Sequence, residues 1–188
     1  MASPRRTDAP IFELNVSLRD VQPPIWRRLR VSADTPLTRL HRVLQLTMGW
    51  EELHDYCFEV GDARYGVPDP ELPGDMLDAR GVRLRQIVPD VGMSCVYEYD
   101  FGDWWLHDLR LEKILPADRV SELPLCIEGA RACPPEGCGG TAGYEEFVAA
   151  IGDPQHPEHA AMFAWRGAPY NPDWFDVRAV NDRLAGMR

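Results

Sequence analysis

Three cysteines lie close together in the second half of the sequence, with the spacing Cys126-x6-Cys133-x4-Cys138. In a cytoplasmic protein, clustered cysteines more often serve a metal or catalysis than disulfides. Thiolates favour Zn²⁺, and a structural zinc site needs a fourth ligand, for which His107 is a candidate beside Glu136 and His54. Only the second gap fits a short zinc knuckle. The alternative is therefore that the three are small buried residues of a loop rich in Gly and Pro.

A second group combines carboxylates with imidazoles: His54, Asp100, Asp103 and His107. Asp103 and His107 are expected near one end of a sheet, where such side chains suit a divalent metal or general acid–base catalysis. The alternative is structural. The two aspartates flank Gly102 and can bond the backbone of a turn, and His107 shares a face with apolar neighbours that is typical of the core.

Six tryptophans in 188 residues are enough to line a pocket or a partner surface, although core packing accounts for most of them. Trp104 and Trp105 are adjacent, so in a strand they cannot both face inward.

Nucleotide-binding loops are missing from the sequence. Residues 138–143 have the glycines of such a loop but no lysine, and they predict no phosphate site.

The elements that would position these residues begin with a hairpin. Residues 11–18 alternate apolar and polar side chains, which predicts a half-buried strand, and Pro23-Pro24 turns the chain into a return strand over residues 25–31. Thr35-Pro36 then predicts a helix start, and apolar residues at helical spacing continue to Met48. Gly49 is a natural stop.

Further along, alternation predicts a strand over residues 54–60 and a hairpin of strands over 95–101 and 105–111, with a loop over 66–81 and a short helical piece near 82–87 between them. Residues 125–143 carry little periodicity and are expected to form a loop. Three helices are expected over 144–151, 158–165 and 177–184, the last with Asp176 as its cap.

This order predicts an α+β fold with a mixed, mainly antiparallel sheet of about five strands, one packed helix in a β-grasp-like arrangement, and a helical C-terminal extension. Residues 1–10 are expected to be a flexible tail, and residues 11–188 a single domain. Within that domain we expect a sheet part over 11–116, followed by a Cys/Gly-rich loop and a helical part over 117–188.

The charge is unevenly distributed. The net charge is −10, but residues 1–50 hold eight Arg and four acids, and the remainder holds twelve basic and twenty-six acidic residues. An acidic body repels phosphate backbones, so a protein partner is favoured over nucleic acid, with the early arginines on solvated faces. The sequence shows no apolar run long enough for a membrane span and no secretory signal, which predicts a soluble cytoplasmic protein.

Several blocks together resemble the plasmid pRiA4b ORF-3-like family, from about residue 11 to residue 184. These blocks are Pro23-Pro24-Ile25-Trp26-Arg27-Arg28, Leu40-His41, Met48-Gly49-Trp50, Tyr99-Asp100-Phe101-Gly102-Asp103, Trp105 with His107, Leu111-Glu112-Lys113-Ile114-Leu115, Ala132-Cys133-Pro134-Pro135-Glu136, Cys138-Gly139-Gly140, Gly143-Tyr144-Glu145-Glu146-Phe147 and His156-Pro157-Glu158-His159.

The resemblance implies an α+β domain associated with mobile elements and without an established activity. Members are sometimes labelled transposon passenger or TnpR-like resolvase proteins, but the sequence shows no nucleophilic serine in a resolvase setting and no basic DNA-binding helix. Many members have a second histidine at the position where this chain has Tyr56. Its loss here argues against an obligatory metal clamp formed with His54. We therefore expect a non-catalytic binding or interaction domain with its contact surface at the Trp-rich end, with a structural zinc ion as an open prediction. The alternative is a metal-dependent, hydrolase-type enzyme that uses the His/Asp group.

Overall fold

The structure is a computed structural model that describes residues 9–71, 74, 76–117 and 122–187. Ala9 and Pro10 lead directly into the first strand, and residues 1–8 of the predicted tail lie outside the described residues. The strands are β1 (Ile11–Leu18), β2 (Trp26–Ser32), β3 (Tyr56–Val60), β4 (Ala63–Gly66), β5 (Leu77–Asp78), β6 (Ser94–Tyr99), β7 (Trp105–Leu115) and β8 (Leu125–Ala130). The helices are α1 (Leu37–Met48), the 3₁₀ turn η1 (Ala79–Gly81), α2 (Leu84–Ile87), α3 (Gly140–Gly152), α4 (His159–Arg166) and α5 (Val177–Ala185).

The eight strands of the described residues form one sheet in the order β5-β4-β3-β6-β7-β1-β2-β8. Its pairs are antiparallel except β4 with β5, so the predicted α+β fold with a mixed, mainly antiparallel sheet is confirmed. The expected count of about five strands is too low, and a β-grasp-like arrangement is not confirmed. The sheet also extends beyond residue 116, because β8 pairs with β2.

β5 and β8 lie in segments that the sequence assigns to loops, and β4 lies mostly between the predicted strand over 54–60 and the predicted loop over 66–81. β4 folds back on β3, β5 is two residues long, and β8 belongs to the Cys/Gly-rich stretch. Because their own patterns are short or interrupted by glycine, these segments become strands through pairing with a neighbour rather than through their own periodicity.

The predicted first hairpin is confirmed. β1 pairs with β2 on one side and β7 on the other, so it lies inside the sheet, with Leu14 and Val16 fully buried. The outer face of this region carries two of the early arginines, which pair with carboxylates: Arg28 bonds Glu112 at 2.8 Å, and Arg30 bonds Glu13 at 2.8 Å. These arginines are therefore neutralised by neighbours within the sheet.

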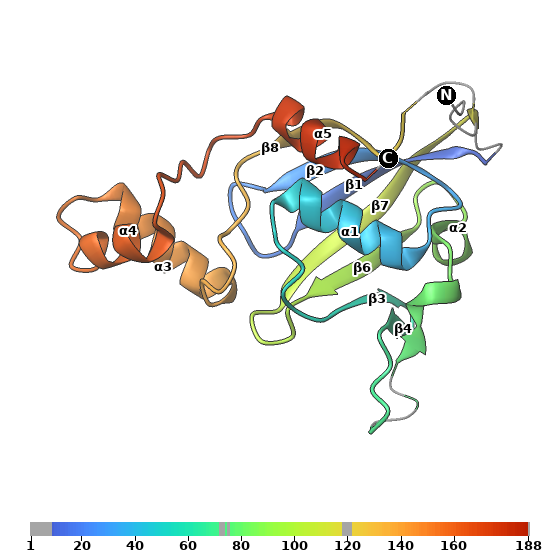
Figure 1. Ribbon diagram of the computed structural model, residues 1–188, viewed down its shortest axis with the longest axis horizontal. Coiled ribbons are helices and arrows are strands. Elements are labelled where there is room, and N and C mark those ends of the chain that lie inside the picture. The colour runs from blue at the N-terminus through green and yellow to red at the C-terminus, as the bar shows by residue number, and fades with distance from the viewer. Residues whose placement is uncertain (1–8, 72–73, 75, 118–121, 188) are drawn as a thin grey trace.

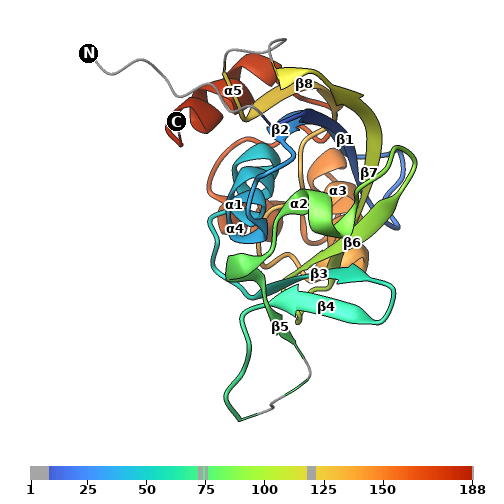
Figure 2. The same cartoon turned by 90° about the vertical axis from the view of Figure 1, so that its right-hand side faces the viewer.

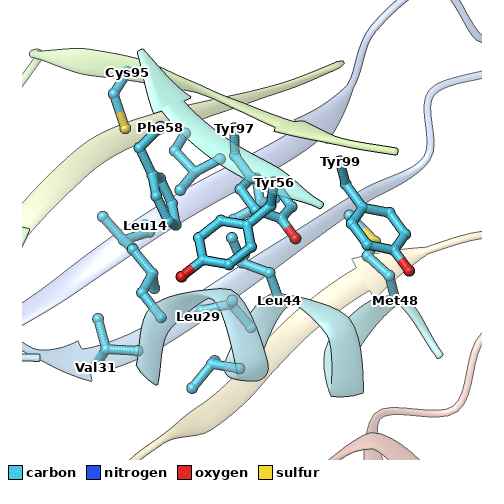
Figure 3. Packing of buried hydrophobic residues seen from close by; sticks show 14 of the residues in the cluster. Leu14, Leu29, Val31, Leu44, Met48, Tyr56, Phe58, Cys95, Tyr97 and Tyr99 are labelled. Carbon is cyan, nitrogen blue, oxygen red and sulfur yellow. The ribbon is translucent and has the colours of Figure 1, made fainter. Parts of the chain in front are cut away.

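The sheet curves around α1, as Figure 2 shows. The apolar stripe of the helix is buried, with Leu37, Leu40, Leu44 and Met48 all in the core. Rings from β3 and β6 point toward this helix in Figure 3, among them Tyr97. The helix starts one residue later than predicted, because Pro36 rather than Thr35 is the N-cap. The helix ends at Gly49 in the left-handed conformation (φ 95°), as predicted.

The C-terminal helices occupy two different places. α5 packs beside β8 and α1 (Figure 1). Asn181 accepts the N–H and donates to the C=O of Cys126, both at 2.8 Å, so these backbone groups of the edge strand β8 have hydrogen-bond partners. The predicted cap Asp176 accepts the N–H groups of residues 178 and 179. α3 and α4 instead form a hairpin at the far side of the molecule (Figure 1), and we call residues 140–166 the arm. Within the described part of the chain, every helix is too short to cross a lipid bilayer.

Candidate functional site

The imidazole of His54 lies against the carboxylate of Asp100 at the turn of the β6–β7 hairpin. His54 Nε2 is 3.4 Å from Asp100 Oδ2, and the His54 side chain is 41% exposed. The other oxygen of Asp100 accepts the N–H groups of Gly102 at 3.0 Å and Asp103 at 3.3 Å. Asp100 therefore organises the turn backbone, as the structural alternative predicts, and leaves one oxygen facing a single histidine.

Asp103 points away from this pair and toward the arm. Its Oδ2 accepts the N–H of Gly139 at 3.1 Å, immediately before α3 begins. Gly140 has φ +70°, and a Cβ there would lie 2.7 Å from the carbonyl oxygen of Asp103. The β6–β7 turn and the start of the arm thus meet backbone to backbone, which requires glycine at this position.

His107 is fully buried and is not part of the His54–Asp100 pair. Its Nδ1 lies 3.0 Å from the carbonyl oxygen of Trp105 and 3.3 Å from that of Tyr97. Burial lowers the pKa of His107 to about 4, so the ring is neutral at physiological pH. The structure therefore places His107 in the core, as the structural alternative expects, and does not bring the four residues of the His/Asp group together.

The three clustered cysteines are thiols whose pKa values are raised by burial. Burial raises the pKa of Cys126 to about 11 and that of Cys138 to about 12, and it also raises the pKa of Cys133. Across the described residues, one set of three His, Cys, Asp or Glu ligand atoms lies within 4.8 Å of one another, and it consists of Cys57, Glu59 and Glu98 rather than the cysteines of the predicted zinc site.

That set surrounds an arginine. The guanidinium of Arg64 bonds Glu59 at 2.9 Å and Glu98 at 3.0 Å, and it also contacts the Cys57 sulfur at 3.3 Å. The carboxylates are thus already paired with a cation on the β3–β4 hairpin. We interpret this set as an ion-pair network within the sheet.

The loop that leads from β8 to the arm is held by buried polar groups of the core. Trp50 Nε1 donates to the carbonyl oxygen of Pro134 at 2.9 Å. The carboxylate of Glu136 accepts the hydroxyl of Tyr99 and the N–H of Glu51. Because these contacts join α1, β6 and the loop, the base of the arm has a defined position relative to the sheet.

Arg27 fastens the same loop at its start. Its side chain is buried with no ion pair to a carboxylate among the described residues, and it donates to the carbonyl oxygens of Trp26 (2.8 Å), Ala130 (2.7 Å) and Arg131 (2.8 Å). The guanidinium also lies 4.2 Å from the centre of the Phe175 ring. One side chain therefore joins β2, the end of β8 and the segment before α5.

The arm contains a mostly apolar helix, α4, whose large aromatic side chains are only partly buried. α4 has no buried residue, although its sequence is mostly apolar, and Phe163 and Trp165 are 45% and 48% exposed. A helix of a globular domain usually buries such a stripe. The predicted Trp-rich surface is thus divided: Trp105 is fully buried, its neighbour Trp104 is exposed, and Trp165 lies on the arm.

A pocket of about 540 Å³ lies between α3, α4 and the loop before α3. Phe147 is buried at its floor, and its ring meets that of Trp165 edge to face, with centroids 5.7 Å apart. Glu146, Glu158 and Met162 also line the pocket. Phe147, Met162 and Phe163 are not among the site residues predicted from the sequence; the available signal was the uninterrupted apolar run over residues 160–165.

Comparisons with known proteins reveal relatives along nearly the whole chain. Residues 10–179 match the family described as plasmid pRiA4b ORF-3-like protein. The uncharacterised protein y4hQ of Sinorhizobium fredii is 42% identical over 161 residues, which are 85% of this chain and 82% of the relative. A crystal structure of a protein of unknown function from Methanosarcina mazei Go1 superposes with a TM-score of 0.82 at 31% identity, covering 92% of this chain and 98% of that one.

Proposed function

This chain belongs to the plasmid pRiA4b ORF-3-like protein family, and we propose that it is a non-catalytic protein-binding domain that docks a partner protein on the arm. The observation that carries the proposal is α4, an apolar helix with no buried residue, beside an apolar pocket. Exposed apolar surface of this kind marks interaction sites in soluble proteins. Aromatic side chains such as Phe163 and Trp165 are common anchors of protein interfaces.

The anchoring of the arm supports binding without large rearrangement. Asp103 holds the start of α3, and Tyr144 on α3 bonds Tyr170 through their hydroxyls at 3.0 Å. Tyr170 in turn donates to the carbonyl oxygen of Cys133 at 3.0 Å. A surface that is fixed before binding loses less conformational freedom on association.

The charges favour a protein over nucleic acid. The arm holds four carboxylates and one guanidinium, that of Arg166. A phosphate backbone is repelled by such a surface. Two of the early arginines, Arg28 and Arg30, offer no substitute, since they are paired with glutamates on the outer face of the sheet.

Catalysis by the predicted His/Asp group has less support, because the group is reduced to His54 and Asp100 and one Asp100 oxygen is used by the turn. A structural zinc ion on Cys126, Cys133 and Cys138 and an association with mobile elements stay predictions. Elemental analysis of protein purified without added metal tests the first of these.

The docking proposal is tested with a synthetic amphipathic peptide that has leucine on one face and glutamine on the other, the Leu/Gln peptide. We expect its titration to shift backbone amide NMR signals of α3 and α4. Phe163→Ser or Trp165→Ser should weaken binding about tenfold, as expected for losing one anchored aromatic side chain. Trp174→Ser, at a tryptophan that is 57% exposed outside the arm, is the matched control.

Two results would contradict the proposal. The first is peptide-induced shifts that lie outside the arm, or no shifts at all. The second is self-association: if light scattering shows a dimer of the full chain that Phe163→Ser converts to a monomer, the arm is covered by a second copy and not by a partner protein.

A further inference from the structure

The pocket of the arm joins an apolar floor to an acidic rim. Phe147 and Met162 contribute apolar surface, and the Trp165 ring stands at 74° to that of Phe147. The two charged side chains of the lining, Glu146 and Glu158, are both carboxylates. The neighbouring guanidinium of Arg166 lines a separate hollow with Trp50 and Glu136.

A histidine also lines the pocket. His156 is half-buried, and its Nδ1 accepts the backbone N–H of Glu158 at 3.2 Å. The lining of the pocket thus combines two carboxylates with the aromatic rings of Phe147 and Trp165. This combination suits a cation with an apolar stem, because the alkyl chain covers the rings while the charged end reaches the carboxylates.

Resting on the proposed function, we infer that the pocket takes a lysine or arginine side chain from a basic, leucine-rich segment of the partner protein. Its volume of about 540 Å³ has room for such a side chain and its neighbours. A small free cation would leave Phe163 uncovered, since Phe163 is 45% exposed and does not line the pocket. A segment of protein covers both, and its basic charge complements the four carboxylates of the arm.

The test compares three peptides on the full-length chain: the Leu/Gln peptide and two versions with glutamine replaced by lysine or by glutamate. We expect the Leu/Lys peptide to bind about tenfold more tightly than Leu/Gln at low salt, as two partly exposed charge pairs allow, and the Leu/Glu peptide to bind more weakly. The preference should shrink as salt is raised.

Variants assign the effect to the pocket. The double change Glu146→Gln and Glu158→Gln should abolish the lysine preference while Leu/Gln binding stays unchanged. Glu145→Gln, at an exposed glutamate next in sequence that does not line the pocket, should retain the preference. If the lysine preference came only from the net charge of the arm, each of the three substitutions would reduce it by a similar amount.

The two proposals fail differently. If all three peptides shift the NMR signals of the arm and bind with equal affinity, the docking proposal is supported and the cation-binding role of the pocket is refuted. If none of them shifts the arm, the docking proposal itself fails. If free lysine amide competes with the Leu/Lys peptide as strongly as Leu/Gln does, the pocket binds a small cation rather than a protein segment.

Discussion

Gly143 on the first turns of α3 is expected to be indispensable for the position of the arm. A Cβ at this residue would lie 1.9 Å from the carbonyl oxygen of Cys138 and 2.9 Å from its carbon, both backbone atoms. Ordinary contact begins near 3.4 Å, so Gly143→Ala must move the helix or the loop by about 1.5 Å. Overpacking of this kind costs about 1–3 kcal/mol, whereas alanine in a helix gains about 1 kcal/mol over glycine.

The net destabilisation is therefore up to about 2 kcal/mol, which corresponds to a Tm lower by up to about 8 °C for a chain of this size. Gly152→Ala is the matched control on the same helix, because a Cβ there meets nothing within 4 Å and the residue has no positive φ. It should leave Tm unchanged or raise it. Calorimetry gives Tm, and amide hydrogen exchange locates the loosening in residues 140–166. A Gly143→Ala protein with wild-type Tm and wild-type protection of the arm would refute the reasoning.

Two further predictions concern the core. Burial lowers the pKa of both His41 and His107 from 6.5 to about 4. Between these pH values the unfolded chain therefore binds more protons than the folded chain. The free energy of unfolding should fall as pH decreases through this window, by up to about 1.4 kcal/mol per pH unit for each histidine. Urea unfolding at a series of pH values measures this slope, and a flat profile from pH 6.5 to 4.5 would show that the rings are not held neutral. Arg27→Lys should lower the free energy of unfolding by about 2–3 kcal/mol, because an ammonium cannot reach the three spread carbonyl oxygens or stack on Phe175 as a guanidinium does. Urea unfolding at neutral pH measures this loss, and Arg39→Lys on the exposed surface of α1 is the control. Equal losses of stability in both variants would contradict the role assigned to Arg27.

The amino-acid sequence by itself determined the elements whose side-chain periodicity is long and regular. The β1–β2 hairpin, α1 with its Gly49 end, and the β6–β7 hairpin all follow from apolar spacing and turn residues, and the structure has each of them. The adjacency of Trp104 and Trp105 indicated that they cannot both face inward, and the structure buries Trp105 and exposes Trp104. These properties are local, because adjacent positions in one element decide which side chains are buried.

Only the tertiary structure decided where the chemistry-bearing residues lie. Cys126, His107 and Asp103 are separated by different strands and loops, and long-range packing sends them to an edge strand, the core and the arm. β8 is a strand because β2 and Asn181 satisfy its backbone, although its own sequence is interrupted by glycine. The exposure of α4 is likewise a property of the whole fold. An apolar eight-residue helix is expected to be buried along one face, and only the placement of every other element shows that Phe163 and Trp165 stay about half exposed.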